Sequence, residues 1–199
     1  MESIFELRFL PQEPDPLFPG KLHAALGKYY PNVEVLSNSG LAGGEPSLRI
    51  VRFSNQNRDL MLQCGPGLLS LVASRPYIGY DEFRRKVKKV TKTLVSIVPD
   101  LVVQRLGLRN VNLFSFPDAE VNVNDFFQLA VQLPDQLHDW PLELFAVTVV
   151  VDPPESSRSV RLNVRSQSRG DELGIILDLD CFEEPDGGVD DIVTWLEES

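Results

Sequence analysis

The stretch LELFAVTVVVDPPESSRSVRLNVRSQSRGDELGIILDLDCF, residues 142–182, decides the fold of this chain. It contains three strand-like runs, at 142–151, 159–168 and 172–182, separated only by the turn-like segments DPPESSR and RGD. Connections this short join antiparallel strands, because a parallel pair needs a crossover of about a dozen residues or more. The stretch therefore predicts an antiparallel meander and argues against a doubly wound parallel sheet.

A two-residue turn at 170–171 sets the register of the last two strands in this meander. Arg161 then lies opposite Asp180, and Asn163 lies opposite Asp178, all on one face of the sheet. Charge balance, with Arg161 neutralising Asp180, is the simpler interpretation. The alternative is a divalent-metal or acid–base site, because two carboxylates two residues apart on a strand can hold Mg²⁺ or act in hydrolysis. A register shifted by one residue would favour that alternative by turning the arginines to the opposite face.

The first half of the chain adds strands and two helices. Residues 3–9 alternate apolar and polar side chains, as a half-buried strand does, and 48–53 and 60–65 form a hairpin that 67–74 continues. A short helix is expected over 17–30, on the stripe of Phe18, Leu22, Leu26 and Tyr29.

The clearest helix is expected over 81–98, where Phe83, Val87, Val90, Leu94 and Ile97 recur at helical spacing. Its basic residues then face solvent; they are Arg84, Arg85, Lys86, Lys88, Lys89 and Lys92. Such a face is usually only a solvated surface, and its alternative role is to bind an acidic partner.

We predict a single α+β domain over 1–199, with a largely antiparallel, curved sheet and two or three helices packed on one side. An N-terminal subregion, 1–100, would hold the helices at 17–30 and 81–98. A strand meander over 101–182 and a terminal helix over 189–198 would follow.

Composition narrows the function classes. The formal net charge of −10 argues against nucleic acid as a partner, because such binding depends on many lysine and arginine contacts to phosphates. No run of 18 apolar residues occurs, so we expect a cytoplasmic protein with no membrane contact. Cys64 and Cys181 are the only cysteines, and we expect both to be reduced.

Catalytic signatures are weak in this sequence. His23 and His138 each stand alone and are expected to be structural. No nucleotide-binding or nucleophile motif occurs, and no cofactor is expected.

Polar residues interrupt the strand RLGLRNVNLF at 105–114. Alternation puts Asn110 and Asn112 on one face and Arg109 on the other, beside Arg105, so they cannot all bind one small ligand from this strand alone. The favoured interpretation is structural, with the amides tying loops to the sheet and Arg109 paired to a carboxylate; the alternative is a groove for a peptide or small anion. Gly107 is expected to allow a bulge or the close approach of another backbone.

Five segments, FELRF, LQCGPGLLSL, RPYIGYDEFRRKV, RLGLRNVNLF and LDLDCF, together resemble an uncharacterised, sporadically distributed family of bacterial proteins. On this resemblance Tyr77, Tyr80 and Phe83 match a motif at a helix start, and Gly107, Arg109 and Asn112 match a G-L-R-x-x-N strand. The family usually has Trp where Tyr80 stands. It also usually continues through a longer helix and a terminal segment, so the ending at WLEES is expected of a shortened relative. The resemblance implies no reaction and no cofactor, and the patchy occurrence of the family suggests a defence or conflict system.

The three aromatic residues of the helix-start motif, Tyr77, Tyr80 and Phe83, are expected to pack over the sheet, because aromatic side chains at this spacing bury large areas.

We therefore expect a non-catalytic module that binds a protein, with homo-oligomer formation left open. Its candidate interaction residues are Arg109, Asn110, Asn112, Arg84, Arg85, Lys88, Lys89, Arg161 and Arg165. The alternative is a metal-dependent hydrolase or nuclease-like enzyme that uses Asp178 and Asp180.

Overall fold

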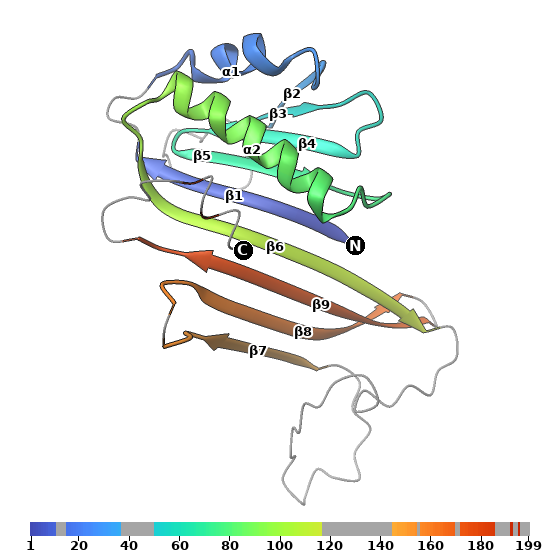
Figure 1. Ribbon diagram of the computed structural model, residues 1–199. Coiled ribbons are helices and arrows are strands. Elements are labelled where there is room, and N and C mark those ends of the chain that lie inside the picture. Colours follow the sequence, from blue (N-terminus) through green and yellow to red (C-terminus); the bar gives the residue numbers. More distant parts are fainter. Residues whose placement is uncertain are drawn as a thin grey trace, which may run out of the picture.

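One open antiparallel sheet organises the structure, a computed structural model (Figure 1). The described residues are 1–10, 15–36, 50–116, 145–154, 156–169, 172–185, 192 and 195. Nine strands in this part of the chain lie in the order β2-β3-β4-β5-β1-β6-β9-β8-β7. They are β1 (Glu2–Leu10), β2 (Asn32–Leu36), β3 (Ile50–Ser54), β4 (Leu60–Gly65), β5 (Leu68–Ala73), β6 (Val102–Phe116), β7 (Ala146–Val151), β8 (Ser159–Arg169) and β9 (Glu172–Glu183).

Two helices, α1 (Phe18–Leu26) and α2 (Tyr80–Ile97), lie over the same face of the sheet (Figure 1). In α2 the predicted apolar stripe is buried except at Ile97, which is partly buried. Asp81 and Glu82 occupy the first turn, where carboxylates interact favourably with the positive end of the helix dipole. The stripe packs against alternate residues of β1, β4, β5 and β6, whose other residues point to the opposite face. Fully buried members of this core include Phe5, Leu7, Leu22, Leu62, Leu71, Phe83, Val87 and Leu94.

The core cluster takes its described members from β1, β3, β4, β5, β6 and both helices, with Tyr30, Ile192 and Trp195. Ile192 and Trp195 are helical and buried, and the rest of the predicted helix at 189–198 lies outside the described residues. None of these core members comes from β7, β8 or β9. The helices therefore cover the first half of the sheet order more completely than the second.

The α+β class and the antiparallel sheet are confirmed, since every strand pair in the sheet is antiparallel. Two details were wrong or missed. The strand β2 was not predicted, because Pro31 marked only the end of the preceding helix. That helix ends at Leu26, so Tyr30 is buried and Tyr29 is exposed, the reverse of the expected stripe.

No described helix is both long enough and apolar enough to cross a membrane.

The prediction for the aromatic residues at the start of α2 is only partly confirmed. Phe83 is buried in the core, but Tyr80 is 38% exposed. Tyr80 is the first residue of the helix, and the Arg84 guanidinium lies 5.8 Å from the centroid of its ring. Tyr80 therefore contacts a cation at the surface and does not pack in the core.

Candidate functional site

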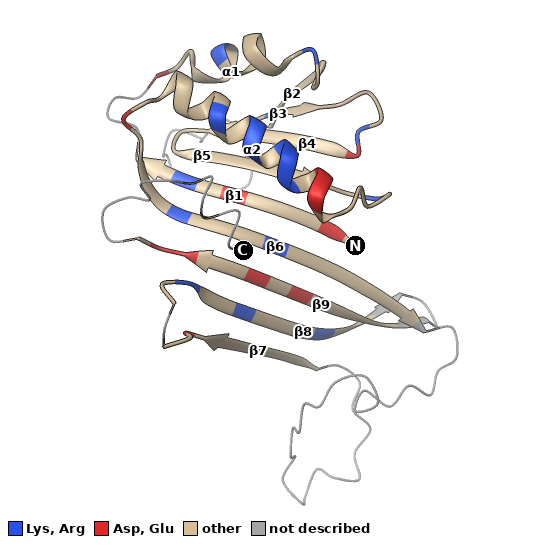
Figure 2. Cartoon of the chain, in the orientation of Figure 1, with Lys and Arg blue, Asp and Glu red and all other residues tan. Residues whose placement is uncertain are grey.

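Charged residues gather on the face of the sheet opposite the helices, in its central strands. The predicted register is confirmed: Arg161 lies across from Asp180 and Asn163 across from Asp178. On the other side of β9, Asp180 lies across from Arg109 of β6. These residues share one face because directly paired residues in an antiparallel sheet point to the same side. Figure 2 shows the resulting rows of basic and acidic positions on β6, β9 and β8.

Arg105 of β6 links two acidic residues, one on each of the strands that flank β6. Its Nη2 donates to Asp180 Oδ2 at 2.7 Å and its Nη1 donates to Glu6 Oε1 at 3.1 Å. Arg8 Nε donates to the same Glu6 oxygen at 2.9 Å. Gly107 makes this arrangement possible, because a Cβ at that position would lie 2.5 Å from Arg105 Nη1. The predicted close approach at Gly107 therefore comes from a side chain and not from another backbone, and the ladder stays regular there.

Arg161 does not form the predicted ion pair with Asp180. Its guanidinium stacks on the Phe182 ring, 5.1 Å from the centroid, and Arg105 lies 5.0 Å from the same ring. Phe182 is buried between these cations, at 8% exposure. Phe182 and Asp180 are two residues apart on one face, so Arg105 contacts both the ring and the carboxylate, whereas Arg161 contacts the ring and acts on Asp180 only through its charge. Within the described residues, Asp180 has its ion pair with Arg105.

Asp178 is paired with Arg109 through both carboxylate oxygens. Arg109 Nε donates to Oδ1 at 2.7 Å and Nη2 donates to Oδ2 at 2.6 Å, the planar two-point geometry that Arg favours. The predicted pairing of Arg109 with a carboxylate is therefore confirmed. A metal held by Asp178 and Asp180 would have to displace two arginine contacts, and the described residues contain no group of three or more potential metal ligands.

Burial raises the pKa of the Asp180 carboxyl above its ordinary value, and the positive charges of Arg105, Arg161 and Arg109 oppose that rise in decreasing order. In the same network, the hydrogen bonds to Asp178 raise the pKa of Arg109. The network is thus a set of compensating charges around the buried Asp180 carboxylate.

The remaining predicted residues of the sheet lie apart from this network. Asn110 points to the helix face, where its Oδ1 accepts from Ser3 Oγ at 2.6 Å, so it ties two strands and not a loop to the sheet. Asn112 shares that face by alternation. On the charged face, Arg165 is exposed, and the Oδ1 of Asn163 is buried without a partner among the described residues.

The other chemically active side chains have structural settings. His23 stacks on Phe53 with ring centroids 5.2 Å apart, and His138 lies outside the described residues. Cys64 and Cys181 are unpaired thiols, as predicted. Burial raises the pKa of the Cys64 thiol to about 12, which makes it a poor nucleophile at neutral pH.

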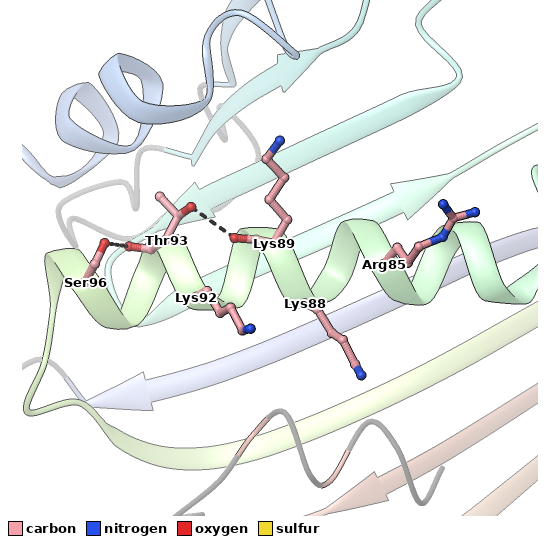
Figure 3. Close-up of a pocket in the computed structure, with 6 residues that line it drawn as sticks. All are labelled: Arg85, Lys88, Lys89, Lys92, Thr93 and Ser96. Atoms are coloured by element: carbon pink, nitrogen blue, oxygen red, sulfur yellow. Dashed lines mark hydrogen bonds between the residues drawn. The ribbon is translucent and has the colours of Figure 1, made fainter.

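A second polar site lies on the outer side of α2, on the helix face of the molecule. A hollow of about 460 Å³ is lined there by Arg85, Lys88, Lys89, Lys92, Thr93 and Ser96, which we call the lysine face (Figure 3). The hydroxyl groups in it donate to the helix backbone, from Thr93 Oγ1 to the Lys89 carbonyl and from Ser96 Oγ to the Thr93 carbonyl. Cations are therefore its main donors to a ligand.

The basic residues of α2 differ in how far their charge is already compensated. In the first turns Arg84 pairs with Asp81, while Arg85 and Lys86 both pair with Glu82. Farther along the helix, Lys89 and Lys92 form no ion pair within the described part of the chain.

Tyr29 extends this cationic surface from the end of α1. Lys89 Nζ lies 3.2 Å from the centroid of the Tyr29 ring, and Lys28 Nζ lies 4.9 Å from it. Interaction with Lys89, and then with Lys28, lowers the pKa of the Tyr29 hydroxyl. The sequence did not identify Lys28 and Tyr29 as members of this surface, because they follow α1 and are distant from α2 in the sequence. It also gave Lys92 no role at the site, although Lys92 lies three residues after Lys89 and four after Lys88, which places all three on one helix face.

Comparison with protein-family models and with curated proteins finds no match for this chain. The resemblance to a sporadically distributed bacterial family therefore stays a prediction.

Proposed function

We propose that this chain is a non-catalytic interaction module that binds an acidic segment of a protein partner on the lysine face of α2. The observation that carries the proposal is the pair Lys89 and Lys92, two cations beside a hollow that make no ion pair within the described residues. Carboxylates of a partner would supply the missing counter-charges, and the exposed Tyr29 ring offers an apolar surface next to them.

The chemistry of the lysine face supports binding in preference to catalysis. Its described lining residues include no carboxylate, imidazole or thiol that could act as a base or nucleophile. The two carboxylates of the alternative hydrolase, Asp178 and Asp180, lie on the other face of the sheet and are engaged by arginines.

A protein is favoured over a nucleic acid as the partner. The whole chain carries a net charge of −10, which repels a long polyanion and leaves only a local basic surface. A short acidic segment needs only a few close contacts, so the distant negative charge of the chain is largely screened at physiological salt.

The test is a fluorescence anisotropy titration with a labelled glutamate-rich peptide, on the parent chain and on two charge-matched variants. Lys89→Glu with Lys92→Glu changes the lysine face. Arg84→Glu with Lys86→Glu makes the same change in charge on the same helix, at cations that are already paired. We expect the first variant to lose about tenfold or more in affinity and the second about threefold or less, since only the first removes direct contacts.

Three results would overturn the proposal: no peptide binding by the parent chain, equal losses in both variants, or tighter binding of a single-stranded oligonucleotide than of the peptide. The first result would mean that the lysine face does not bind acidic peptides. The second would mean that binding depends on the overall charge of the helix and not on Lys89 and Lys92, and the third would mean that the partner is a nucleic acid.

A further inference from the structure

Among the described residues β7 lies at one end of the sheet order, and its own sequence lacks the residues that commonly protect an edge strand. Its sequence AVTVVV contains no charged residue, no Pro and no Gly. Val149, Val150 and Val151 are 39%, 50% and 52% exposed, so both faces of the strand present apolar surface. Natural edge strands are commonly blocked by charges, prolines or bulges, because an open edge can pair with another extended chain.

The peptide groups that β7 directs away from β8 can be identified. The Phe145 carbonyl accepts from the Ser166 backbone N–H at 3.0 Å, so the peptide groups of residue 145 point toward β8. Inward and outward groups alternate along an antiparallel strand. The backbone N–H and C=O groups of Ala146, Thr148 and Val150 therefore point to the open side.

The residues beside this edge are suited to carboxylates. In the register of β7 with β8, Ala146 lies next to Arg165 and Val150 lies next to Arg161. Neither arginine forms an ion pair within the described residues, but the Arg161 guanidinium lies over Phe182 of β9, so Arg165 is the cation that can reach a strand beyond β7. Ala146 is small, so the long Arg165 side chain can extend over it toward a strand placed beyond β7, about 10 Å from β8. Figure 2 shows the uncharged β7 next to the basic positions of β8.

The pairing of β8 with β9 provides a pattern for such a strand. On that side β8 faces the sequence Leu-Asp-Leu-Asp, residues 177–180. The aspartates lie on the charged face with Arg161, and the leucines lie on the helix face. On the open side, Val147, Val149 and Val151 of β7 likewise point to the helix face, while Ala146, Thr148 and Val150 share the charged face.

We propose that β7 accepts an extended peptide segment of a partner protein as a tenth, antiparallel strand, and that the segment alternates acidic with apolar residues. Backbone hydrogen bonds to Ala146, Thr148 and Val150 supply affinity that does not depend on sequence. The acidic side chains face Arg165, and the apolar side chains extend the valine surface. This contact is separate from the lysine face and does not depend on it.

The test uses a fluorophore-labelled peptide of about ten residues that alternates aspartate and valine, titrated into the full chain. Thr148→Pro removes one outward N–H and leaves the bonds between β7 and β8 in place, because Pro is tolerated where the N–H of an edge strand faces solvent. Thr148→Ala is the matched control that keeps the N–H. We expect the Pro variant to raise the Kd about tenfold or more and the Ala variant to change it less than about twofold.

Arg165→Glu tests the contact between Arg165 and the acidic side chains of the peptide, and it leaves the backbone groups of β7 unchanged. It therefore remains informative if Thr148→Pro folds poorly. We expect it to weaken the aspartate peptide about fivefold or more and to strengthen a matched peptide that has lysine at each aspartate position. No binding by the parent chain, or equal affinities for the two peptides, would overturn the proposal. So would sedimentation of the parent chain as a dimer that Thr148→Pro converts to a monomer, because β7 would then pair with a second copy.

Discussion

Replacing Arg105 by Met tests the charge network most sharply. The substitution keeps an unbranched apolar stem beside Phe182 but removes the guanidinium that pairs with Glu6 and Asp180. The Asp180 side chain is only 10% exposed, so its carboxylate cannot recover full hydration. Removing one partner of a buried pair typically costs about 3–5 kcal/mol, and we expect about 3 kcal/mol here because the positive charges of Arg161 and Arg109 still act on Asp180.

The cost should depend on pH in a defined direction. Burial already raises the pKa of Asp180 in the folded chain above 3.8, and loss of Arg105 raises it further. A carboxyl that binds its proton more tightly in the folded state destabilises that state at pH values above its folded pKa, and the penalty disappears as the pH falls through that pKa. The Arg105→Met penalty should therefore be largest near neutral pH and shrink on acidification.

Urea denaturation of the parent, Arg105→Met, Asp180→Asn and the double variant, at neutral and mildly acidic pH, measures these quantities. Asp180→Asn removes the charge that Arg105 compensates, so we expect the two changes to couple by about 1–2 kcal/mol. Additive effects within about 0.5 kcal/mol, or a penalty for Arg105→Met that grows as the pH falls, would refute the reasoning.

Two further predictions follow from burial. Phe83→Ala should lower the free energy of unfolding by about 3–5 kcal/mol because it leaves a cavity between α2 and the sheet, whereas Tyr80→Ala should cost less than about 1 kcal/mol; similar losses in the two variants by thermal denaturation would contradict the packing described. Cys64, with a pKa of about 12, should carry a thiolate fraction of only about one in ten thousand at pH 8, so a disulfide reagent should label it only as the chain unfolds; rapid labelling under native conditions, located by peptide mapping, would contradict its burial.

The sequence predicted the structure well where the spacing of apolar residues along one segment determines which face is buried. The apolar stripe of α2 and the alternation in β1 each have one simple way to be buried, and the two-residue turn predicted at 170–171 gave the register that β8 and β9 show. Local spacing was therefore enough to place Arg161 and Asp180 on the same face.

Partner choice within that face could not be predicted in the same way. Pairing of β6 with β9 joins residues far apart in sequence, and it brings Arg105 and Arg109 to Asp180 and Asp178. With several arginines in reach of two carboxylates, the choice depends on details such as the missing Cβ at Gly107, which lets Arg105 lie across the backbone. For the same reason the lysine face was predicted only in part, because Tyr29 comes from the end of α1.

Carbodiimide crosslinking of the parent chain to an N-acetylated glutamate-rich peptide, followed by mass spectrometry, tests the proposed function most directly. The reagent joins a carboxylate to an amine only when the two are in contact, so the crosslinks report where the acidic segment lies. The account predicts crosslinks at Lys89 and Lys92, suppressed at high salt, with few at Lys86, whose ammonium is held by Glu82. Crosslinks concentrated at Lys86 or at Lys21 of α1, or spread evenly over all lysines, would contradict an acidic-peptide site on the lysine face.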